Sequence, residues 1–467
     1  MLKKMRIKNF KCWSDTDMIS LAPISLFFGA NSSGKSSISQ FLMMLKQTVE
    51  SPDRKAVFYP GGKNSAVLLG SYQDMVFHHD VKNKISFEYM WSRNEQIQFK
   101  DPISEDVFSG NEVSFFAEIG LNRSKQNSLN VEKLKYKLLN DDQQTLAVEL
   151  LRKNEKNEYI INSEQYNLVR KKMRAWALKE VVRFYGFPDE AVAYYQNAEF
   201  VQELNLEQEK LFKSIYYLGP LRTKADRLYT WAGITPESVG FAGENAIAAV
   251  LAARNRRINL GYRKVTKPLE EIIALKLVEM GLIEDFKVNQ ISEQRQEYEV
   301  KVRTKGSKDW VDLPDVGFGI SQVLPVLVQC FYAPPGSIII MEQPEIHLHP
   351  SAQSALADVM IDVVNSRENG KCRNIQLIIE THSEHFLRRL QRRIAEDKVS
   401  DQQVSVYFAN VSKTPATLDP LVIDTYGNIK NWPDGFFGDE MEDITEQAKA
   451  GMRKRMQQVS IDCEVDE

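Results

Sequence analysis

Cysteine is scarce in this chain of 467 residues. The four cysteines, Cys12, Cys330, Cys372 and Cys463, lie far apart and form no CxxC pair. A disulfide framework or a cysteine-based zinc site needs partners at short, repeated spacings, so this pattern argues against both. We therefore expect unpaired thiols in a reducing cytoplasm.

Long apolar runs and a surplus of basic charge are also missing. No segment reaches the ~18 consecutive apolar residues that a bilayer-spanning helix needs, and MLKKMRIKNF does not lead into a signal-peptide core. With 60 basic against 63 acidic residues, the formal net charge of -3 gives no global positive field to attract nucleic acid. We expect a cytoplasmic protein with no membrane partner, in which DNA contact is possible only through a local patch. Candidate patches are the short basic runs Arg388 to Arg393 and Arg453 to Arg455, which can equally be solvated helix faces.

The N-terminal part of the chain reads as a strand, a loop and a helix. Apolar runs at residues 5–10 and 24–28 predict two short strands, and the second leads directly into a glycine-rich turn. From Ile38 to Val49 the apolar residues recur at helical spacing. A hydrophobic content of 43% can bury a large core.

The middle of the chain differs from both ends. Partial alternation at residues 85–90, 113–119, 133–139 and 145–151 predicts a β-rich arm, and residues 164–213 have a charged, helix-favouring composition. Because no heptads are sustained there, we expect a compact insertion and no long coiled coil.

The C-terminal part returns to an α/β pattern. Residues 337–341, 375–380 and 404–409 are apolar strands separated by helical patterns, and NAIAAVLAARNRR predicts a further helix. Such alternation is typical of a parallel sheet with crossover helices. The predicted fold class is α/β: a mostly parallel sheet with flanking helices plus a β-rich arm, with a mixed β/helical insertion. We divide it into an N-terminal lobe (1–80), the insertion (81–215), a C-terminal lobe (216–415) and a tail (416–467).

The strongest motif is GANSSGKS at residues 29–36, a full match to GxxxxGK[ST]. Backbone N–H groups of such a loop surround phosphates, Lys35 reaches the β- and γ-phosphate oxygens of ATP, and Ser36 binds Mg²⁺. The remaining residues expected to bind nucleotide are Asn31, Ser32, Ser33, Gly34 and Ser37. A chance glycine-rich turn is disfavoured because a strand precedes the motif and a helix follows it.

A second motif is MEQPEIHLHP, which follows the apolar strand SIII. An acid at the end of a buried parallel strand beside a P-loop can hold the water shell of Mg²⁺, and Glu342 is the candidate. Taken alone, a carboxylate at a strand end is usually only solvated. The P-loop upstream favours the metal role.

Two weaker motifs complete the set. DVGFGISQ (residues 315–322) opens an apolar helix with two glycines, which expose backbone N–H groups to an anion or simply form a turn and cap. The strand QLIIE ends at Thr381-His382-Ser383, which puts His382 in reach of a γ-phosphate, although a lone histidine is more often structural. The order of the four motifs carries more information than each motif does.

In that order the motifs resemble those of the ABC-type ATPases of the SMC, RecF and OLD group, and RIKNFKCW resembles the opening strand of that group. The blocks YLGPLR, TPESVG, GENAIAA, DVGFGISQVLPVL, MEQPEIHLHP, ETHSEH and IDTYGNIKNWPDGFF resemble prokaryotic AAA ATPases that carry a C-terminal DUF3696 domain. These blocks cover both ends of the chain and hardly touch its middle.

The resemblance implies that this α/β fold is an ABC-type P-loop ATPase head. It also implies a homodimer, or a higher homo-oligomer, that closes on ATP. Gly319 and Ser321 would then reach the γ-phosphate from the opposing protomer, and His382 would be the switch histidine. Gln73 would sense Mg²⁺ as a Q-loop residue, with an ordinary loop glutamine as the alternative. Arg222 and Arg227 would contact nucleotide or partner, with plain surface arginines as the default.

One residue departs from the ABC pattern. Gln343 stands where a catalytic glutamate is expected, and glutamine cannot take a proton from water. We therefore predict slow hydrolysis, unless Glu345 or His382 orients the attacking water.

Relatives of this kind act in antiphage defence as the ATPase subunit of Septu-like systems, beside a separate HNH nuclease. The resemblance thus implies a sensor or regulatory ATPase with a nuclease partner; the alternative is a RecF-like DNA-binding ATPase in repair or recombination. An OLD-type nuclease is disfavoured because the stretch after His382 shows no Toprim acid set. Only His78 and His79 lie away from the ATP-site motifs, which leaves no HNH-type histidine cluster.

Overall fold

The computed structural model describes residues 1–122, 128–154, 157–172, 176–179, 181–411, 415–433 and 445–452. Its centre is a six-stranded sheet in which the first five strands are parallel and the last is antiparallel to its neighbour. In spatial order the strands are β10 (Ile215–Leu218), β17 (Ile338–Glu342), β20 (Gln376–Glu380), β4 (Ile24–Gly29), β21 (Val404–Asn410) and β22 (Thr417–Leu421). The strand β20 therefore separates the P-loop strand β4 from β17.

Both faces of this central sheet are covered. Along β17, Ile338 and Ile340 belong to one hydrophobic core, whereas Ile339 and Met341 belong to the other. Strands buried on both faces read as continuous apolar runs, which is why the sequence pattern predicted β4, β17, β20 and β21. The two edge strands, β10 and β22, were not predicted.

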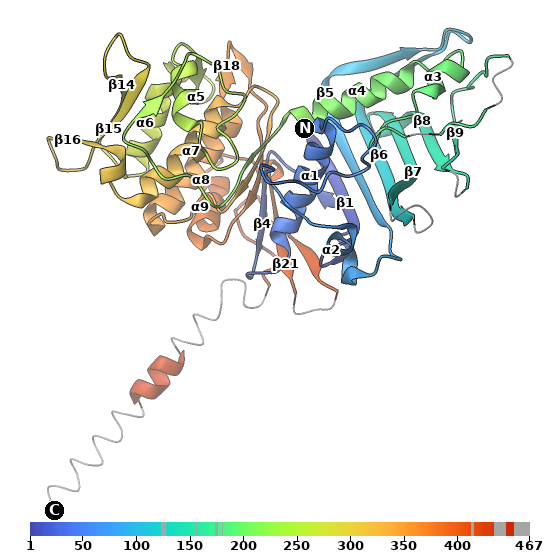
Figure 1. Ribbon diagram of the computed structural model, residues 1–467. Helices are drawn as coiled ribbons and strands as arrows, with labels where there is room; N and C mark the ends of the chain where they lie inside the picture. The colour runs from blue at the N-terminus through green and yellow to red at the C-terminus, as the bar shows by residue number, and fades with distance from the viewer. Residues whose placement is uncertain are drawn as a thin grey trace, which may run out of the picture.

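On one face, helix α1 (Lys35–Glu50) lies between the central sheet and a second sheet (Figure 1). The ring of Phe41 on α1 meets the rings of Phe10 and Phe87 of the second sheet at centroid distances of 5.0 and 5.1 Å. Helix α4 (Phe200–Lys213) packs beside α1 in the same core, and α3 (Glu190–Tyr194) precedes it. The P-loop helix is thus fixed from both sides.

The second sheet is antiparallel throughout. Its strands are, in spatial order, β2 (Trp13–Asp15), β1 (Leu2–Phe10), β5 (Ile85–Lys100), β6 (Val107–Asn122), β7 (Ser128–Asn140), β8 (Gln143–Arg152) and β9 (Tyr159–Ser163), with β3 (Ile19–Ser20) on β1. The predicted β-rich arm is confirmed, and it includes the N-terminal strand.

Helices cover the other face of the central sheet, on the left of Figure 1. They are α5 (Ala246–Ala252), α6 (Leu269–Glu279), α7 (Phe318–Tyr332), α8 (Pro350–Asn365) and α9 (Glu384–Ala395). Two small sheets flank them: one joins β11 (Tyr229–Thr230), β15 (Glu297–Arg303), β14 (Asp285–Gln290) and β16 (Trp310–Asp312), and the other joins β13 (Thr266–Pro268), β12 (Arg257–Asn259), β18 (Arg367–Glu368) and β19 (Lys371–Cys372).

The predicted fold class is confirmed, with three local corrections. Among the described residues of the helix-favouring segment 164–213, which leave out 173–175 and 180, the α-helices are those at 190–194 and 200–213. The helix predicted at 245–257 ends at Ala252, and Arg257 already begins strand β12. The small sheets of residues 229–312 and 257–372 had no sequence signal that we recognised.

Within the described part of the chain, no helix is both long and apolar enough to cross a bilayer.

Candidate nucleotide site

The P-loop joins β4 to α1 and can be built only with glycine at its two ends. Gly29 has φ 146° and Gly34 has φ 89°, a region that side chains disfavour. A Cβ on Gly34 would lie 2.2 Å from the sulfur of Cys12, and one on Gly29 would lie 2.6 Å from the carbonyl oxygen of Ala409. The loop is therefore packed tightly against β1–β2 on one side and β21 on the other.

Lys35 is the first residue of α1 and folds back over its own loop. Its ammonium donates to the carbonyl oxygens of Gly29 (3.0 Å) and Ala30 (2.7 Å), and the residue is almost fully buried. Burial lowers the pKa of Lys35, and the nearby carboxylate of Glu380 opposes that shift. A bound phosphate would supply the negative charge that this buried ammonium lacks.

A cavity of about 430 Å³ opens in front of the P-loop. Its lining contains the predicted residues Asn31, Ser32, Ser33, Gly34, Lys35, Ser36, Ser37, Gln343 and His382, together with Lys11, Cys12, Gln40 and Glu380. The structure therefore brings P-loop, Gln343 and switch histidine together in one place. Their assigned roles stay predictions.

Two glutamates end adjacent strands near this cavity, and only Glu380 lines it. In the register of the sheet, Glu342 of β17 is level with Glu380 of β20, and Glu380 is level with Phe27 of β4. Glu342 accepts a hydrogen bond from the hydroxyl of Tyr217 (2.9 Å), whereas Glu380 accepts one from the hydroxyl of Ser36 (3.0 Å). Burial, followed by the charge of Glu380, raises the pKa of Glu342 to about 7. Burial also raises the pKa of Glu380.

The loop after β17 is held in a strained turn. Gln343 has φ 45°, its N–H donates to the carbonyl oxygen of Glu380 (2.8 Å), and the residue lines the cavity. Such left-handed backbone at a non-glycine residue costs about 1–3 kcal/mol and is held in place by its surroundings. The carbonyl oxygen of Gln343 accepts the N–H of Ile346 (3.1 Å). In the same loop, the carboxylate of Glu345 accepts the backbone N–H of His382 (2.8 Å). Burial raises the pKa of Glu345.

The signature motif lies elsewhere. Gly317 caps α7, and Ser321, in its first turn, donates to the carbonyl oxygen of Phe318 (2.7 Å). Gly319 approaches the loop after β17 so closely that a Cβ would lie 2.8 Å from the carbonyl oxygen of His347. Neither Gly319 nor Ser321 lines the P-loop cavity of its own chain.

Five other predicted residues also lie outside that cavity: the glutamates Glu342 and Glu345, and the residues Gln73, Arg222 and Arg227. Gln73 is exposed on the short helix α2 (Tyr72–Met75). Arg227 is exposed and pairs with Asp315 (2.7 Å) and Asp312 (3.2 Å). The default interpretation of Arg222 as a surface arginine is wrong, because its buried guanidinium donates to the carbonyl oxygens of Gln322 (3.3 Å), Glu342 (3.1 Å) and Gln343 (3.1 Å).

Sequence reasoning missed Arg222 as a link between motifs, and it missed Glu380. Arg222 ties the first turns of α7 to the end of β17, a role that depends on contacts across 100 and more residues. Glu380 did have a signal, since it ends an apolar strand within the block ETHSEH. That signal has meaning only once β20 is known to lie next to β4.

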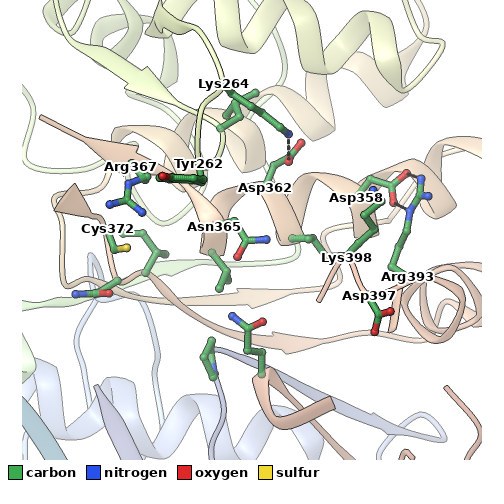
Figure 2. Close-up of a pocket in the computed structure, with 18 of the residues that line it drawn as sticks. Tyr262, Lys264, Asp358, Asp362, Asn365, Arg367, Cys372, Arg393, Asp397 and Lys398 are labelled. Carbon is green, nitrogen blue, oxygen red and sulfur yellow. Dashed lines mark hydrogen bonds and ion pairs between the residues drawn. The ribbon is translucent and has the colours of Figure 1, made fainter. Parts of the chain in front are cut away.

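A larger cavity, of about 910 Å³, lies at the opposite ends of the strands (Figure 2). Its lining includes Pro23 and Ile375, which precede β4 and β20. Ligands of open α/β sheets bind at the carboxyl ends of the strands, so this cavity is not the expected nucleotide site. Its charges are largely paired, as in the ion pairs Lys264–Asp362 (3.2 Å) and Arg393–Asp358 (2.6 Å).

The residues at the P-loop fit ATP with Mg²⁺. The loop offers backbone N–H groups and a buried ammonium for phosphate, and Ser36 and Glu380 offer the oxygen donors that Mg²⁺ prefers. One oxygen of Glu380, Oε2, is buried and has no hydrogen-bond partner. Mg²⁺ held there would neutralise the negative charge that develops on the phosphates. Over the ranges that the structure describes, no group of three or more His, Cys, Asp or Glu side chains could hold a metal ion by itself.

Comparison with known families gives two matches. The model described as "AAA domain, putative AbiEii toxin, Type IV TA system" matches residues 24–388. The model described as "Protein of unknown function (DUF3696)" matches residues 399–447. Among curated proteins, an ATP/GTP phosphatase of Helicobacter pylori is 22% identical over 403 residues, which cover 86% of this chain and 90% of that protein.

Solved structures of SMC heads are similar to this chain at low sequence identity. The SMC head domain from Thermotoga maritima is 10% identical with a TM-score of 0.40, over 90% of this chain and 98% of that one. An SMC head bound to the C-winged helix domain of ScpA is 10% identical with a TM-score of 0.41, over the same shares. An SMC head with an extended coiled coil, bound to a ScpA domain from Pyrococcus furiosus, is 11% identical with a TM-score of 0.41, over 90% and 96%.

Proposed function

We propose that this ATPase, which belongs to the AAA-domain family described as "putative AbiEii toxin, Type IV TA system", works as an ATP-dependent dimer in an antiphage defence complex. Two copies close on two ATP molecules, and Lys35 of one copy and Ser321 of the other contact each ATP. Hydrolysis or release of nucleotide reopens the pair, and a separate nuclease acts on the signal.

The observation that carries the dimer is the separation of the two phosphate-binding motifs. Ser321 stands in the first turn of a 15-residue helix, whose N-terminus favours an anion, yet it does not line the cavity of Lys35. The same region exposes large apolar side chains, with Leu221 85% and Phe318 48% exposed. A helix N-terminus that faces no phosphate of its own chain, beside exposed apolar side chains, is expected at an interface with a second copy of the chain.

Arg222 supplies the connection between nucleotide state and dimer face. Its guanidinium holds the carbonyl oxygen of Gln322 on α7 and those of Glu342 and Gln343 at the end of β17. A movement of the Gln343 backbone during hydrolysis would therefore displace α7, the helix that carries Ser321, because one arginine is hydrogen-bonded to both.

A separate effector is supported by where the histidines lie. His382 lines the ATP cavity, His347 packs against Phe318, and His349 caps α8. Of the remaining three, His78 stacks on Phe77, His79 bonds the carbonyl oxygen of Gln73, and the backbone carbonyl of His385 accepts the hydroxyl of Ser354. These histidines have packing or capping contacts in place of a shared metal site. The proposed partner is an HNH-type nuclease. We also propose that the chain divides into four parts, with boundaries after residues 80, 215 and 415.

Direct DNA binding, the alternative function, finds little support on α9. The positive charge of the basic run Arg388 to Arg393 is mostly compensated: its four arginines pair with three carboxylates, those of Glu384, Asp358 and Glu396, at 2.5–3.1 Å. The other basic run, 453–455, and most of the aromatic WPDGFF segment, 434–437, lie outside the described residues. Trp432, which begins that segment, lies 4.8 Å from the guanidinium of Arg388.

The test of the shared sites is complementation in a mixture. Lys35→Ala and Ser321→Arg should each abolish ATP hydrolysis, and the mixed heterodimer should regain one intact site and part of the activity. A mixture as inactive as both parents would show that the sites are not shared.

The separate effector is tested with the purified chain free of partners, which should leave plasmid and phage DNA intact in the presence of ATP and Mg²⁺ or Mn²⁺. DNA cleavage that is lost in Lys35→Ala would contradict the separate effector. A salt-dependent DNA titration with and without ATP tests the alternative.

A further inference from the structure

Glu380 occupies a central position that none of the four motifs assigns. It is the last residue of β20, the strand between β4 and β17, so it is one strand closer to the P-loop than Glu342. The carboxyl ends of these parallel strands meet at one edge of the sheet, directly in front of the loop that holds phosphate.

The contacts of Glu380 point toward a cation. Its Oε1 accepts the hydroxyl of Ser36 (3.0 Å), the residue that binds Mg²⁺ in a P-loop. Its Oε2 has no partner although the residue is only 5% exposed. A buried carboxylate oxygen without a hydrogen bond is costly, and a cation or its water shell would satisfy it.

Glu342 differs in both respects. Its Oε1 is held by the hydroxyl of Tyr217 (2.9 Å), and Glu342 does not line the P-loop cavity, whereas Glu380 does. Two glutamates at equivalent strand ends are thus turned to different neighbours: one to a tyrosine of β10, the other to the serine of the P-loop.

We propose that Glu380 is a metal-binding residue of this ATPase, which holds the nucleotide's divalent cation, or one of its waters, together with Ser36. The inference rests on the proposed ATP site and deepens it, because it assigns the metal to a carboxylate other than the one in the MEQPE motif. By donating its proton to Glu380, Ser36 keeps its oxygen lone pairs free for the cation. Glu342 then supports the end of β17, through Tyr217 and through its carbonyl contact with Arg222.

The test measures metal affinity directly. Mn²⁺ is titrated into the full-length chain saturated with ADP, and the bound Mn²⁺ is followed by electron paramagnetic resonance or calorimetry. ADP affinity in EDTA is measured in parallel. Glu380→Gln should lower Mn²⁺ affinity about 10- to 100-fold and leave metal-free ADP affinity unchanged. Glu380→Asp, which keeps the charge, should recover part of the affinity, and Glu342→Gln should have the smaller effect.

The matched control is Glu384→Gln, a glutamate four residues away that pairs with Arg388 and does not line the cavity. It should bind Mn²⁺ like the wild type. Wild-type Mn²⁺ affinity in Glu380→Gln, or a loss confined to Glu342→Gln, would overturn the assignment to Glu380 while the ATP site itself stands. Failure of the wild type to bind ADP with or without metal would instead refute the proposed ATP site, and the inference with it.

Discussion

Replacing Gln343 by glutamate should raise the rate of ATP hydrolysis. Gln343 lies at the P-loop cavity on a backbone with φ 45°, and its N–H and carbonyl are both held, by Glu380 and Arg222. The position is therefore fixed before substrate arrives, and glutamate is nearly the same size as glutamine. What the substitution changes is the ability to accept a proton from the attacking water.

The magnitude follows from the surroundings of residue 343. A positioned general base contributes roughly 10²- to 10⁴-fold in rate. The buried carboxyl groups of Glu342 and Glu380 lie at the two neighbouring strand ends, and like charges raise the pKa of an added carboxylate. We therefore expect the lower end, about 10²-fold, which equals ~2.7 kcal/mol of barrier.

Glu345 is the residue that could already act in place of the missing base. One of its oxygens accepts the N–H of His382 and the other is buried without a partner. Glu345→Gln should therefore lower whatever turnover the wild type has.

The assay is phosphate release at saturating Mg·ATP. Gln402→Glu, which adds the same charge at an exposed site on the short helix after α9, is the control and should leave the rate unchanged. Rapid wild-type turnover that is indifferent to both Gln343→Glu and Glu345→Gln would refute the reasoning about this loop.

Three further predictions concern packing and charge. Gly34→Ala combines φ 89° with a contact of 2.2 Å to Cys12, so it should lower the free energy of unfolding by about 2–4 kcal/mol in urea, partly recovered by adding Cys12→Ala. Arg373 is fully buried and donates to the carbonyl oxygens of Cys330 and Phe331. Arg373→Met should lower the free energy of unfolding by about 3–5 kcal/mol, whereas the exposed control Arg388→Met should leave it almost unchanged. Because the pKa of Glu342 rises from 4.5 to about 7 on folding, the folded chain holds a proton that the unfolded chain releases, and stability falls as pH rises through that window. As the pH rises from 4.5 to 7, the free energy of unfolding of Glu342→Gln should therefore increase by up to ~3 kcal/mol relative to that of the wild type. The same difference between variant and wild type at both pH values would contradict this prediction.

The parts of the fold that were predictable are those whose signals are local. The P-loop, its strand and its helix are adjacent in sequence, and the strands at 338–342, 376–380 and 404–410 are apolar throughout because both of their faces are buried. Turn chemistry and periodicity are sufficient for such elements.

The parts that were not predictable depend on contacts between distant residues. Strand β1 pairs with β5, some 80 residues away, and nothing local specifies that pairing. In the segment 164–189, Tyr166, Phe184 and Phe187 are buried in the core beneath the antiparallel sheet, and this packing prevails over a helix-favouring composition. The same holds for the site: the choice between Glu342 and Glu380 depends on strand order, which no motif states.

The central claim is that ATP binds in front of Lys35, and calorimetry on the wild type and Lys35→Ala tests it most directly. The ammonium makes charge-assisted hydrogen bonds of about 1.5–3 kcal/mol each, so the loss of two should weaken ATP binding by at least ~10²-fold. Lys63→Ala, at an exposed lysine that does not line the cavity, serves as the control and should bind ATP like the wild type. The predicted result is that the wild type and Lys63→Ala bind ATP equally well, whereas Lys35→Ala binds it at least ~10²-fold more weakly. An ATP affinity unchanged by Lys35→Ala would contradict the account.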